Sequence, residues 1–281
     1  MFTQKRKKNL IKFGVIFLVG IVVIGAVLIS LSIRNTKPLP KPHKVIKYVK
    51  VSIPEGFTVR QIANRFEKNK LCKSEDFISA SNKIITKYKF EKYIVKGRIP
   101  KYEGYFFPAT YDIPEKSIPK VIAEMMFKAL DKRFTPAMYD RCKSMGMTPD
   151  EVITLASIVQ VEGAKIVDFP KIAGVFINRL QMKTKLQSDA TINYYVNTLK
   201  DKTKIQDVKF TEIETPYNTY LFNGLTPGPI SNPGMDAINA VLHYEKNDYL
   251  FFYGDISTGK TYYAKTFSEH ETNRLKYGPA R

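Results

Sequence analysis

A glutamate at the end of an apolar helix is the residue of this sequence best suited to acid–base chemistry. Glu162 follows Leu155 by seven residues and Ile158 by four, so its carboxylate shares a helix face with apolar side chains. Partial burial and the negative end of the helix dipole both raise the pKa of such a carboxyl group. A carboxyl that stays protonated near neutral pH can donate its proton to a leaving oxygen. The competing interpretation is a glutamate that faces solvent or pairs with Lys165 or Arg179.

Two polar loops carry side chains that could bind a substrate. They contain Gln187, Ser188, Asp189 and Thr191 in LQSDAT, and Tyr217, Asn218, Thr219 and Tyr220 in TPYNTY. Asn178, in FINRL, ends an apolar helical segment. Amide and hydroxyl groups beside flat aromatic rings suit carbohydrate recognition. Taken singly, each of these residues favours ordinary turn chemistry, and His270 favours a surface position over a place in the site.

A well-capped helix is expected to hold Glu162. Thr148 is its predicted N-cap, Pro149 occupies the first helical position, and Glu151 completes a capping box. This pattern predicts a helix over 148–162. Its predicted buried stripe consists of Val152, Leu155, Ala156, Ile158 and Val159.

The pattern of apolar and polar residues in the rest of the chain predicts both helices and strands. It predicts a strand over 46–51, a helix capped by Thr58, helical structure over 74–95, helices over 117–133 and 169–182, and strands over 249–253 and 260–263. The predicted fold class is therefore α+β. We expect a cytoplasmic tail and transmembrane anchor at 1–36, a Pro/Lys linker at 37–45, a small α+β subdomain at 46–98 and a mixed α+β catalytic domain at 99–281.

An N-terminal apolar segment predicts a single membrane span. Residues 13–33 form 21 consecutive residues without a charge, about 31 Å of helix, which matches the hydrocarbon thickness of a bilayer. No cleavage motif follows this segment, so we expect a retained anchor. The basic residues Lys5 to Lys8 place the N-terminus in the cytoplasm by the positive-inside rule. The rest of the chain is then expected outside the cytoplasm.

The net charge of the chain and its cysteine and histidine content limit the classes of function that it can have. The formal net charge is +19, and the chain after residue 34 still carries 39 basic and 26 acidic residues. Outside the cytoplasm this charge favours an anionic wall polymer over nucleic acid. Three histidines without a ligand motif predict neither a metal site nor a cofactor. Cys72 and Cys142 allow either one disulfide or two free thiols.

Four segments together resemble a known family. They are EGYFFPATY at 103–111, LASIVQVEG at 155–163, FINRLQMKTKLQSDATINY at 176–194 and ETPYNTYLFNGLTPGPISNPG at 214–234. In this order, from about residue 51 to residue 277, the sequence is similar to the endolytic murein transglycosylases, or YceG-like family. The N-terminal anchor also matches this family.

The resemblance implies an enzyme that cleaves the MurNAc–GlcNAc β-1,4 bond within peptidoglycan strands and leaves a 1,6-anhydro-MurNAc end. The catalytic acid of the family motif corresponds to Glu162, whereas the first acid of that motif is replaced by Gln160. We expect Asp189 to give electrostatic support, and Gln187, Tyr217 and Asn218 to hold sugar groups. Peptidoglycan strands are the implied partner, and peptidoglycan synthases are a further partner that the resemblance suggests.

Two other functions stay open at this stage. The chain could be an inactive, membrane-tethered peptidoglycan-binding scaffold, with Gln160 marking lost catalysis, or an anchored hydrolase that releases reducing ends. The absence of GxSxG and SxxK motifs argues against a nucleophilic peptidase. Many family members also carry a LysM-like module after the anchor, where this chain has the short linker.

Overall fold

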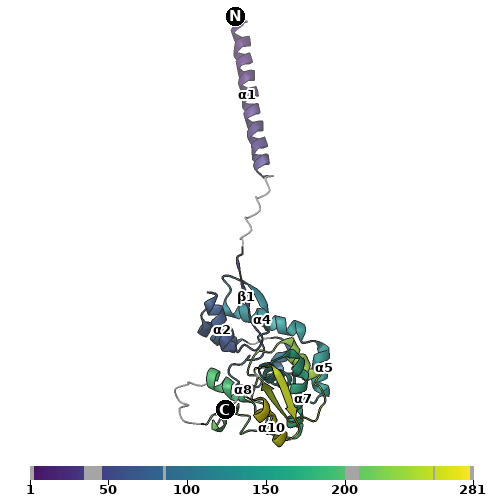
Figure 1. Cartoon of the computed structure of the whole chain (residues 1–281). Coiled ribbons are helices and arrows are strands. Elements are labelled where there is room, and N and C mark those ends of the chain that lie inside the picture. Colours follow the sequence, from purple (N-terminus) through teal and green to yellow (C-terminus); the bar gives the residue numbers. More distant parts are fainter. Residues whose placement is uncertain (1–2, 35–45, 85–86, 200–208, 256, 279–281) are drawn as a thin grey trace. The chain divides into compact units, whose positions relative to one another are not determined.

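The computed structural model describes residues 3–34, 46–84, 87–199, 209–255 and 257–278. The chain divides into two compact units, Met1–Val45 and Ile46–Arg281. Figure 1 follows the order of their elements along the chain by colour.

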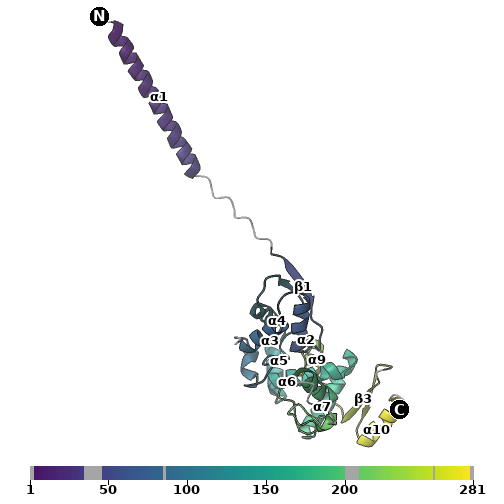
Figure 2. The same cartoon turned by 90° about the vertical axis from the view of Figure 1, so that its left-hand side faces the viewer.

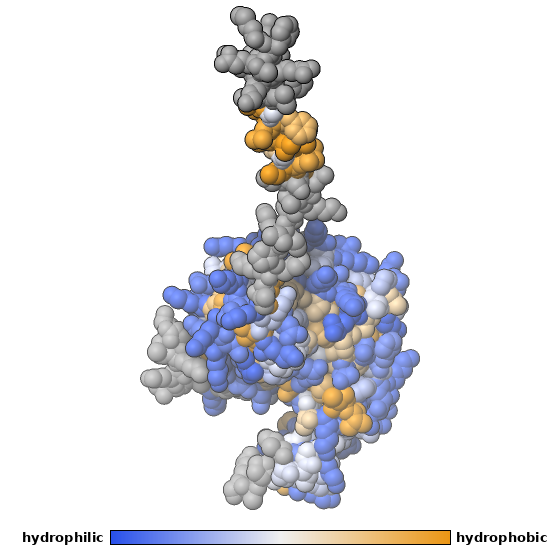
Figure 3. All heavy atoms as spheres, turned by 90° about the horizontal axis from the view of Figure 1, so that it is seen from above, coloured by the Kyte–Doolittle hydropathy of each residue, from blue (hydrophilic) through white to orange (hydrophobic). Residues whose placement is uncertain are grey.

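Within the residues that the structure describes, the first unit consists of the helix α1 over Thr3–Arg34. Its segment Gly14–Leu31 is long and apolar enough to cross a membrane by length and composition. In Figure 3 the coloured part of this helix is mostly orange, whereas the visible face of the second unit is mostly blue. The fold thus contains the predicted apolar N-terminal helix. The predicted linker, 37–45, lies outside the described residues.

The second unit is α+β, as predicted. Its helices are α2 (Val59–Lys68), α3 (Ser74–Lys83), α4 (Pro119–Arg133), α5 (Pro136–Ser144), α6 (Pro149–Glu162), α7 (Phe169–Gln181), α8 (Asp189–Tyr194), α9 (Met235–Leu242) and α10 (Phe267–Tyr277). Shorter turns are the 3₁₀ helices η1 (Lys89–Tyr93), η2 (Ile166–Asp168) and η5 (Phe210–Glu212), and the π-helical η3 (Tyr195–Leu199). The strands form two antiparallel pairs, β1 (Tyr48–Ser52) with β2 (Thr110–Pro114) and β3 (Phe251–Asp255) with β4 (Lys260–Ala264).

The pairing of β1 with β2 joins the predicted small subdomain to the residues that follow it. Val51 lies opposite Tyr111, and both side chains are buried. One hydrophobic core extends from this pair to α9. We therefore describe 46–281 as one unit, and a division at residue 98 stays a prediction.

Two sequence predictions differ from the structure. Helical structure over 74–95 is interrupted, because α3 ends at Lys83 and only the short η1 follows. The apolar pattern of 117–133 predicts that Val121, Ile122, Met125 and Leu130 face inward. Ile122 and Leu130 are buried as predicted, whereas Val121 is exposed and Met126 and Phe127 are buried in addition. Cys72 and Cys142 are both free thiols.

Helix α6 lies at the centre of the core and packs against α7 and α9 (Figure 2). The capping box predicted for its N-terminus is present, with Thr148 accepting from the Glu151 N–H and Glu151 accepting from the Thr148 N–H. The predicted stripe is buried, and Ile153, Thr154 and Ser157 on the other faces are buried as well. A helix enclosed on all sides has little freedom to rotate, so it fixes the direction in which its last residue points.

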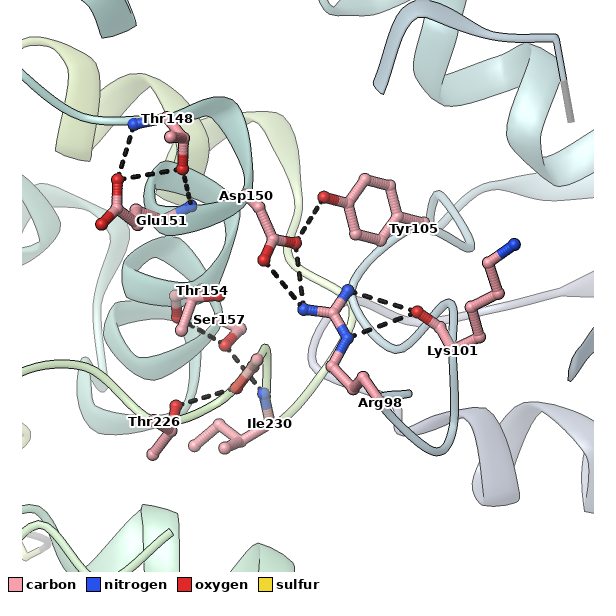
Figure 4. A network of polar contacts seen from close by, with 11 residues as sticks. Arg98, Lys101, Tyr105, Thr148, Asp150, Glu151, Thr154, Ser157, Thr226 and Ile230 are labelled. Atoms are coloured by element: carbon pink, nitrogen blue, oxygen red, sulfur yellow. Dashed lines mark hydrogen bonds and ion pairs between the residues drawn. The ribbon is translucent and has the colours of Figure 1, made fainter. Parts of the chain in front are cut away.

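A buried ion pair anchors the first turn of α6 (Figure 4). Arg98 Nη1 lies 3.0 Å from Asp150 Oδ2, and both side chains are almost completely buried. The hydroxyl of Tyr105 donates to Asp150 at 2.6 Å, and Arg98 also donates to the carbonyl of Lys101. Further along the helix, Ser157 Oγ accepts from the Ile230 N–H at 2.9 Å and so attaches the 226–231 loop. These contacts hold α6 at both halves of its length.

Replacing Asp150 with asparagine is expected to destabilise the protein by about 3–5 kcal/mol, because it leaves the buried Arg98 charge without its counter-ion. Chemical denaturation of the full chain in detergent measures this loss. The matched control is Asp248→Asn, since Asp248 pairs with Lys265 in an exposed position. That control is expected to cost less than about 1 kcal/mol. Equal losses in the two variants would contradict the argument.

Candidate active site

Glu162 ends α6 and is half-buried. The chain leaves the helix directly after it, at the C-cap Gly163, and turns into η2 and α7. A Cβ atom at residue 163 would lie 2.5 Å from the ring of Phe169, so only glycine permits this close approach. The turn thus keeps the carboxylate at the edge of the core.

The carboxylate of Glu162 meets one of the two polar loops expected from the sequence. Ser188 Oγ donates a hydrogen bond of 2.5 Å to Glu162 Oε1. Ser188 is itself buried and immediately precedes α8. Its backbone N–H donates to Thr219 Oγ1 at 3.0 Å, and the Gln187 N–H donates to the Thr219 carbonyl at 3.0 Å. The second polar loop therefore holds the first one against Glu162.

The surroundings of Glu162 favour its protonated form. Burial is the largest influence and raises the pKa of this carboxyl group above its ordinary value. The hydrogen bond from Ser188 lowers the pKa, the negative charge of Asp189 raises it, and the backbone of Ala190 lowers it. The net direction is upward, as the sequence analysis expected.

Arg179 does not pair with Glu162 but supports the loop that carries Ser188. Its Nη1 donates to Gln187 Oε1 at 3.0 Å and to the carbonyls of Lys185 and Leu186. Gln187 has a φ of 50°, a left-handed conformation that costs energy for a residue with a side chain. The contacts of Arg179 hold this loop conformation and occupy the side-chain oxygen of Gln187, although Gln187 as a whole stays exposed.

Asp189 lies at the first turn of α8, beside Ser188, and is exposed. Tyr220 donates its hydroxyl hydrogen to Asp189 Oδ1 at 2.7 Å. Burial is the largest influence on Tyr220, and the hydrogen bond to Asp189 adds to it, so the pKa of this phenol is raised. The pair places one negative charge and one hydroxyl group next to Glu162.

Tyr217, Asn218 and Thr219 are buried in the second loop. The Asn218 amide donates to the carbonyls of Thr211 and Ile213, and its oxygen accepts from the Tyr220 N–H. Tyr217 packs against the ring of Tyr194, with 5.4 Å between centroids. These contacts shape the loop, so a direct hold by Asn218 or Tyr217 on sugar groups remains a prediction that this geometry does not favour.

Asn178 and His270 lie in other surroundings. The Asn178 amide donates to the carbonyls of Asn247 and Tyr249 and so joins α7 to the chain before β3. His270 is half-buried on α10 and stacks on Phe251 with 5.5 Å between ring centroids. Burial lowers the pKa of this imidazole. The described side-chain contacts of the two residues are therefore with the segment before β3, with β3 and with α10 rather than with Glu162.

Gln160 points away from Glu162. Its Oε1 accepts a hydrogen bond of 2.9 Å from the Gly234 N–H. An amide oxygen and a carboxylate oxygen can both accept this bond. The replacement of the motif's first acid by Gln160 therefore leaves the described contacts of Glu162 in place.

Glu103 is a residue that the sequence analysis did not single out. Its side chain is almost completely buried and accepts hydrogen bonds from the Val59 N–H, the Asn232 amide and the Tyr194 hydroxyl. Burial raises the pKa of this carboxyl group to about 8, although the hydrogen bonds lower it. The sequence does contain a sign of this burial, because Glu103 is the only acidic residue in the otherwise aromatic and apolar segment EGYFFPATY.

Comparison with known proteins places this chain in a family. The sequence pattern of the YceG-like family matches residues 30–276. A protein of Streptococcus pneumoniae D39 named endolytic murein transglycosylase is 37% identical over 243 residues, which are 79% of this chain and 43% of that protein. A protein of the same name from Bacillus subtilis 168 is 38% identical over 177 residues, 62% of this chain and 48% of that protein.

A crystal structure of a YceG-like protein from Listeria monocytogenes has the same fold. Its TM-score is 0.71 at 35% identity, and the match covers 81% of this chain and 76% of that one. The chain spans less than half of the length of the curated relatives it matches. The motifs, the fold and the extent of the match agree, and this chain belongs to the YceG-like family.

Proposed function

We propose that this protein is an endolytic peptidoglycan transglycosylase in which Glu162 acts first as a general acid and then as a base. The observation that carries the proposal is the half-buried carboxyl of Glu162, whose pKa burial raises and which Ser188 orients. The curated relatives named endolytic murein transglycosylase support the reaction class.

The reaction needs one carboxyl group and no water. Protonated Glu162 gives its proton to the glycosidic oxygen as the bond from that oxygen to C1 of MurNAc breaks, which frees the GlcNAc hydroxyl. The carboxylate then accepts the proton of the MurNAc C6 hydroxyl group, while the oxygen of that hydroxyl group forms a new bond to C1. This closes the 1,6-anhydro ring and restores the acid. A second carboxylate that activates water, as hydrolases use, has no part in it.

The neighbours of Glu162 have distinct roles in this scheme. The Ser188 hydroxyl stabilises the carboxylate that forms after proton donation, because a hydrogen bond to the charged form favours it. Asp189 supplies negative charge near a sugar ring that becomes positive as its C1–O bond breaks. Gln187 is exposed beside them, and its side-chain NH₂ group can donate to a sugar while its side-chain oxygen accepts from Arg179.

The membrane topology is part of the proposal. Helix α1 anchors the chain, the basic residues Lys5 to Lys8 stay in the cytoplasm, and the second unit acts outside it on peptidoglycan strands. Peptidoglycan synthases are proposed partners by the family resemblance. Protease accessibility of tagged termini in intact cells tests the orientation.

Product analysis tests the reaction against its two alternatives. Purified sacculi are incubated with the full chain in detergent and in ¹⁸O-labelled water, and the muropeptides are identified by mass spectrometry. Anhydro-MurNAc ends without ¹⁸O support the transglycosylase. Reducing ends that carry ¹⁸O would instead indicate a hydrolase, and binding without new ends would indicate a scaffold.

Two substitutions beside Glu162 are expected to move the pH profile in opposite directions. The acid must be protonated in the free enzyme, so kcat/KM falls as pH rises through its pKa. Asp189→Asn removes a charge that raises this pKa, so the alkaline limb should move to lower pH. Ser188→Ala removes a hydrogen bond that lowers the pKa, so the limb should move to higher pH. Shifts of both variants in the same direction would contradict this assignment.

A further inference from the structure

A pocket with both polar and apolar lining residues lies beside Glu162, between the first turn of α2 and the α8–η3 segment. Its volume is about 380 Å³, and its lining includes Thr58, Arg60, Val161, Ala190, Asn193 and Asn197. We call it the α8 trough. The volume lies within the roughly 300–1,000 Å³ of sites that bind small molecules.

The α8 trough begins next to the proposed catalytic carboxyl. Val161 and Ala190 line it, and they are the chain neighbours of Glu162 and Asp189. The backbone of Ala190 also interacts with the Glu162 carboxyl. A glycan strand bound in the trough would therefore lead up to the reacting group.

One face of α8 and η3 forms a wall of the trough. Residues 190, 193, 194 and 197 all line it, at the spacing that puts side chains on the same side of a helix. The span from 190 to 197 is about 10 Å of helix. The trough thus extends away from Glu162 along this wall and is not confined to one point.

The side chains of the wall suit an uncharged, hydroxyl-rich ligand. Asn193 is exposed, and its amide has no hydrogen-bond partner among the described residues. Asn197 donates to the Asn193 carbonyl, which leaves its amide oxygen available as an acceptor. No carboxylate is found among the described residues that line the trough. Amides offer both donors and acceptors, the combination that sugar hydroxyl and N-acetyl groups require.

A single buried residue holds both walls. Glu103 accepts from the Val59 N–H, which belongs to the first turn of α2, and from the Tyr194 hydroxyl on α8. The capping box of Thr58 and Gln61 fixes the same turn of α2. Walls that are held before the ligand arrives lose less conformational entropy when it binds.

We infer that the α8 trough is the subsite that binds the N-acetylated sugar units of a glycan strand on one side of the bond to be cleaved. The inference rests on the proposed function of Glu162 for its location. The recognition itself rests on the amides of Asn193 and Asn197, which face the trough with hydrogen-bonding capacity to spare. Arg60 lies at the α2 wall and is paired with Glu75, so we do not assign it a ligand.

The test measures binding and turnover separately. The test variant is the full chain in detergent with Asn193→Ala and Asn197→Ala together. The control variant carries Asn239→Ala, because Asn239 is an exposed asparagine of α9. The probe is a glycan strand from which an amidase has removed the stem peptides. Affinity is measured with Glu162→Gln in the background, so that the strand is not cut during the measurement.

We expect the double variant to bind the peptide-free strand about 10-fold more weakly, as the loss of one to two hydrogen bonds predicts, and the control to bind like the parent. With Glu162 intact, KM should rise while kcat changes much less. Unchanged affinity would overturn the inference, and so would a loss seen only with strands that retain stem peptides. A wild-type chain that binds through these residues but forms no anhydro ends would refute the proposed reaction and leave the subsite standing.

Discussion

Replacing Glu162 with glutamine is expected to slow the formation of anhydro ends on sacculi by about 10²- to 10⁴-fold, the usual contribution of a general acid. The amide oxygen of glutamine can still accept the hydrogen bond from Ser188, so the loop should keep its position. What is lost is the proton. Binding of peptidoglycan and the free energy of unfolding should therefore stay close to the wild-type values.

The matched control for this variant is Glu115→Gln, because Glu115 is an exposed carboxylate next to β2. It removes one negative charge without touching the site and should keep wild-type activity. Glu162→Asp adds a second comparison, since it keeps the acid but draws it back from Ser188 by one methylene group. Anhydro ends formed at a wild-type rate by Glu162→Gln would exclude Glu162 as the acid.

The helix that carries Glu162 was predictable because its signals are local. Thr148 and Glu151 cap it within one turn, and apolar residues follow at helical spacing. The upward direction of the pKa shift of Glu162 followed from its position on the apolar face and at the C-terminal end of this helix. Strands β3 and β4 were also found to within about two residues by their aromatic and β-branched composition.

The features that depend on distant parts of the chain were not predictable in this way. Strand β2 is five residues long and is stabilised by pairing with β1, which lies some sixty residues earlier. Asn218 looked like a ligand-binding residue by its type, yet its amide closes its own loop onto Thr211 and Ile213. The spacing of polar residues does not reveal which of them turn inward, because this depends on the carbonyl groups that tertiary packing brings near.

Glu103 is a second buried residue, besides Asp150, whose loss should strongly destabilise the fold. Glu103→Leu leaves the buried Val59 N–H, the Asn232 amide and the Tyr194 hydroxyl without their acceptor. Each unsatisfied buried donor costs about 1–3 kcal/mol, so we expect the three together to cost roughly 3–9 kcal/mol. Denaturation of the full chain in detergent measures it, with the exposed Glu115→Leu as the control. A loss no larger than that of the control would contradict this role.

The titration of Glu103 gives the same residue a second, independent signature. Burial raises its pKa from the ordinary 4.5 to about 8, so the folded protein binds more protons than the unfolded chain between these values. The contribution of this group to stability is therefore complete below about pH 4.5 and is lost as pH rises through about 8. Glu103→Gln cannot titrate and should remove this part of the pH dependence while it retains an acceptor oxygen for the Val59 N–H. The difference in unfolding free energy between wild type and Glu103→Gln should consequently shift in favour of the variant as pH increases from 5 to 8. A difference that stays constant over this range would show that Glu103 is already ionised in the folded protein.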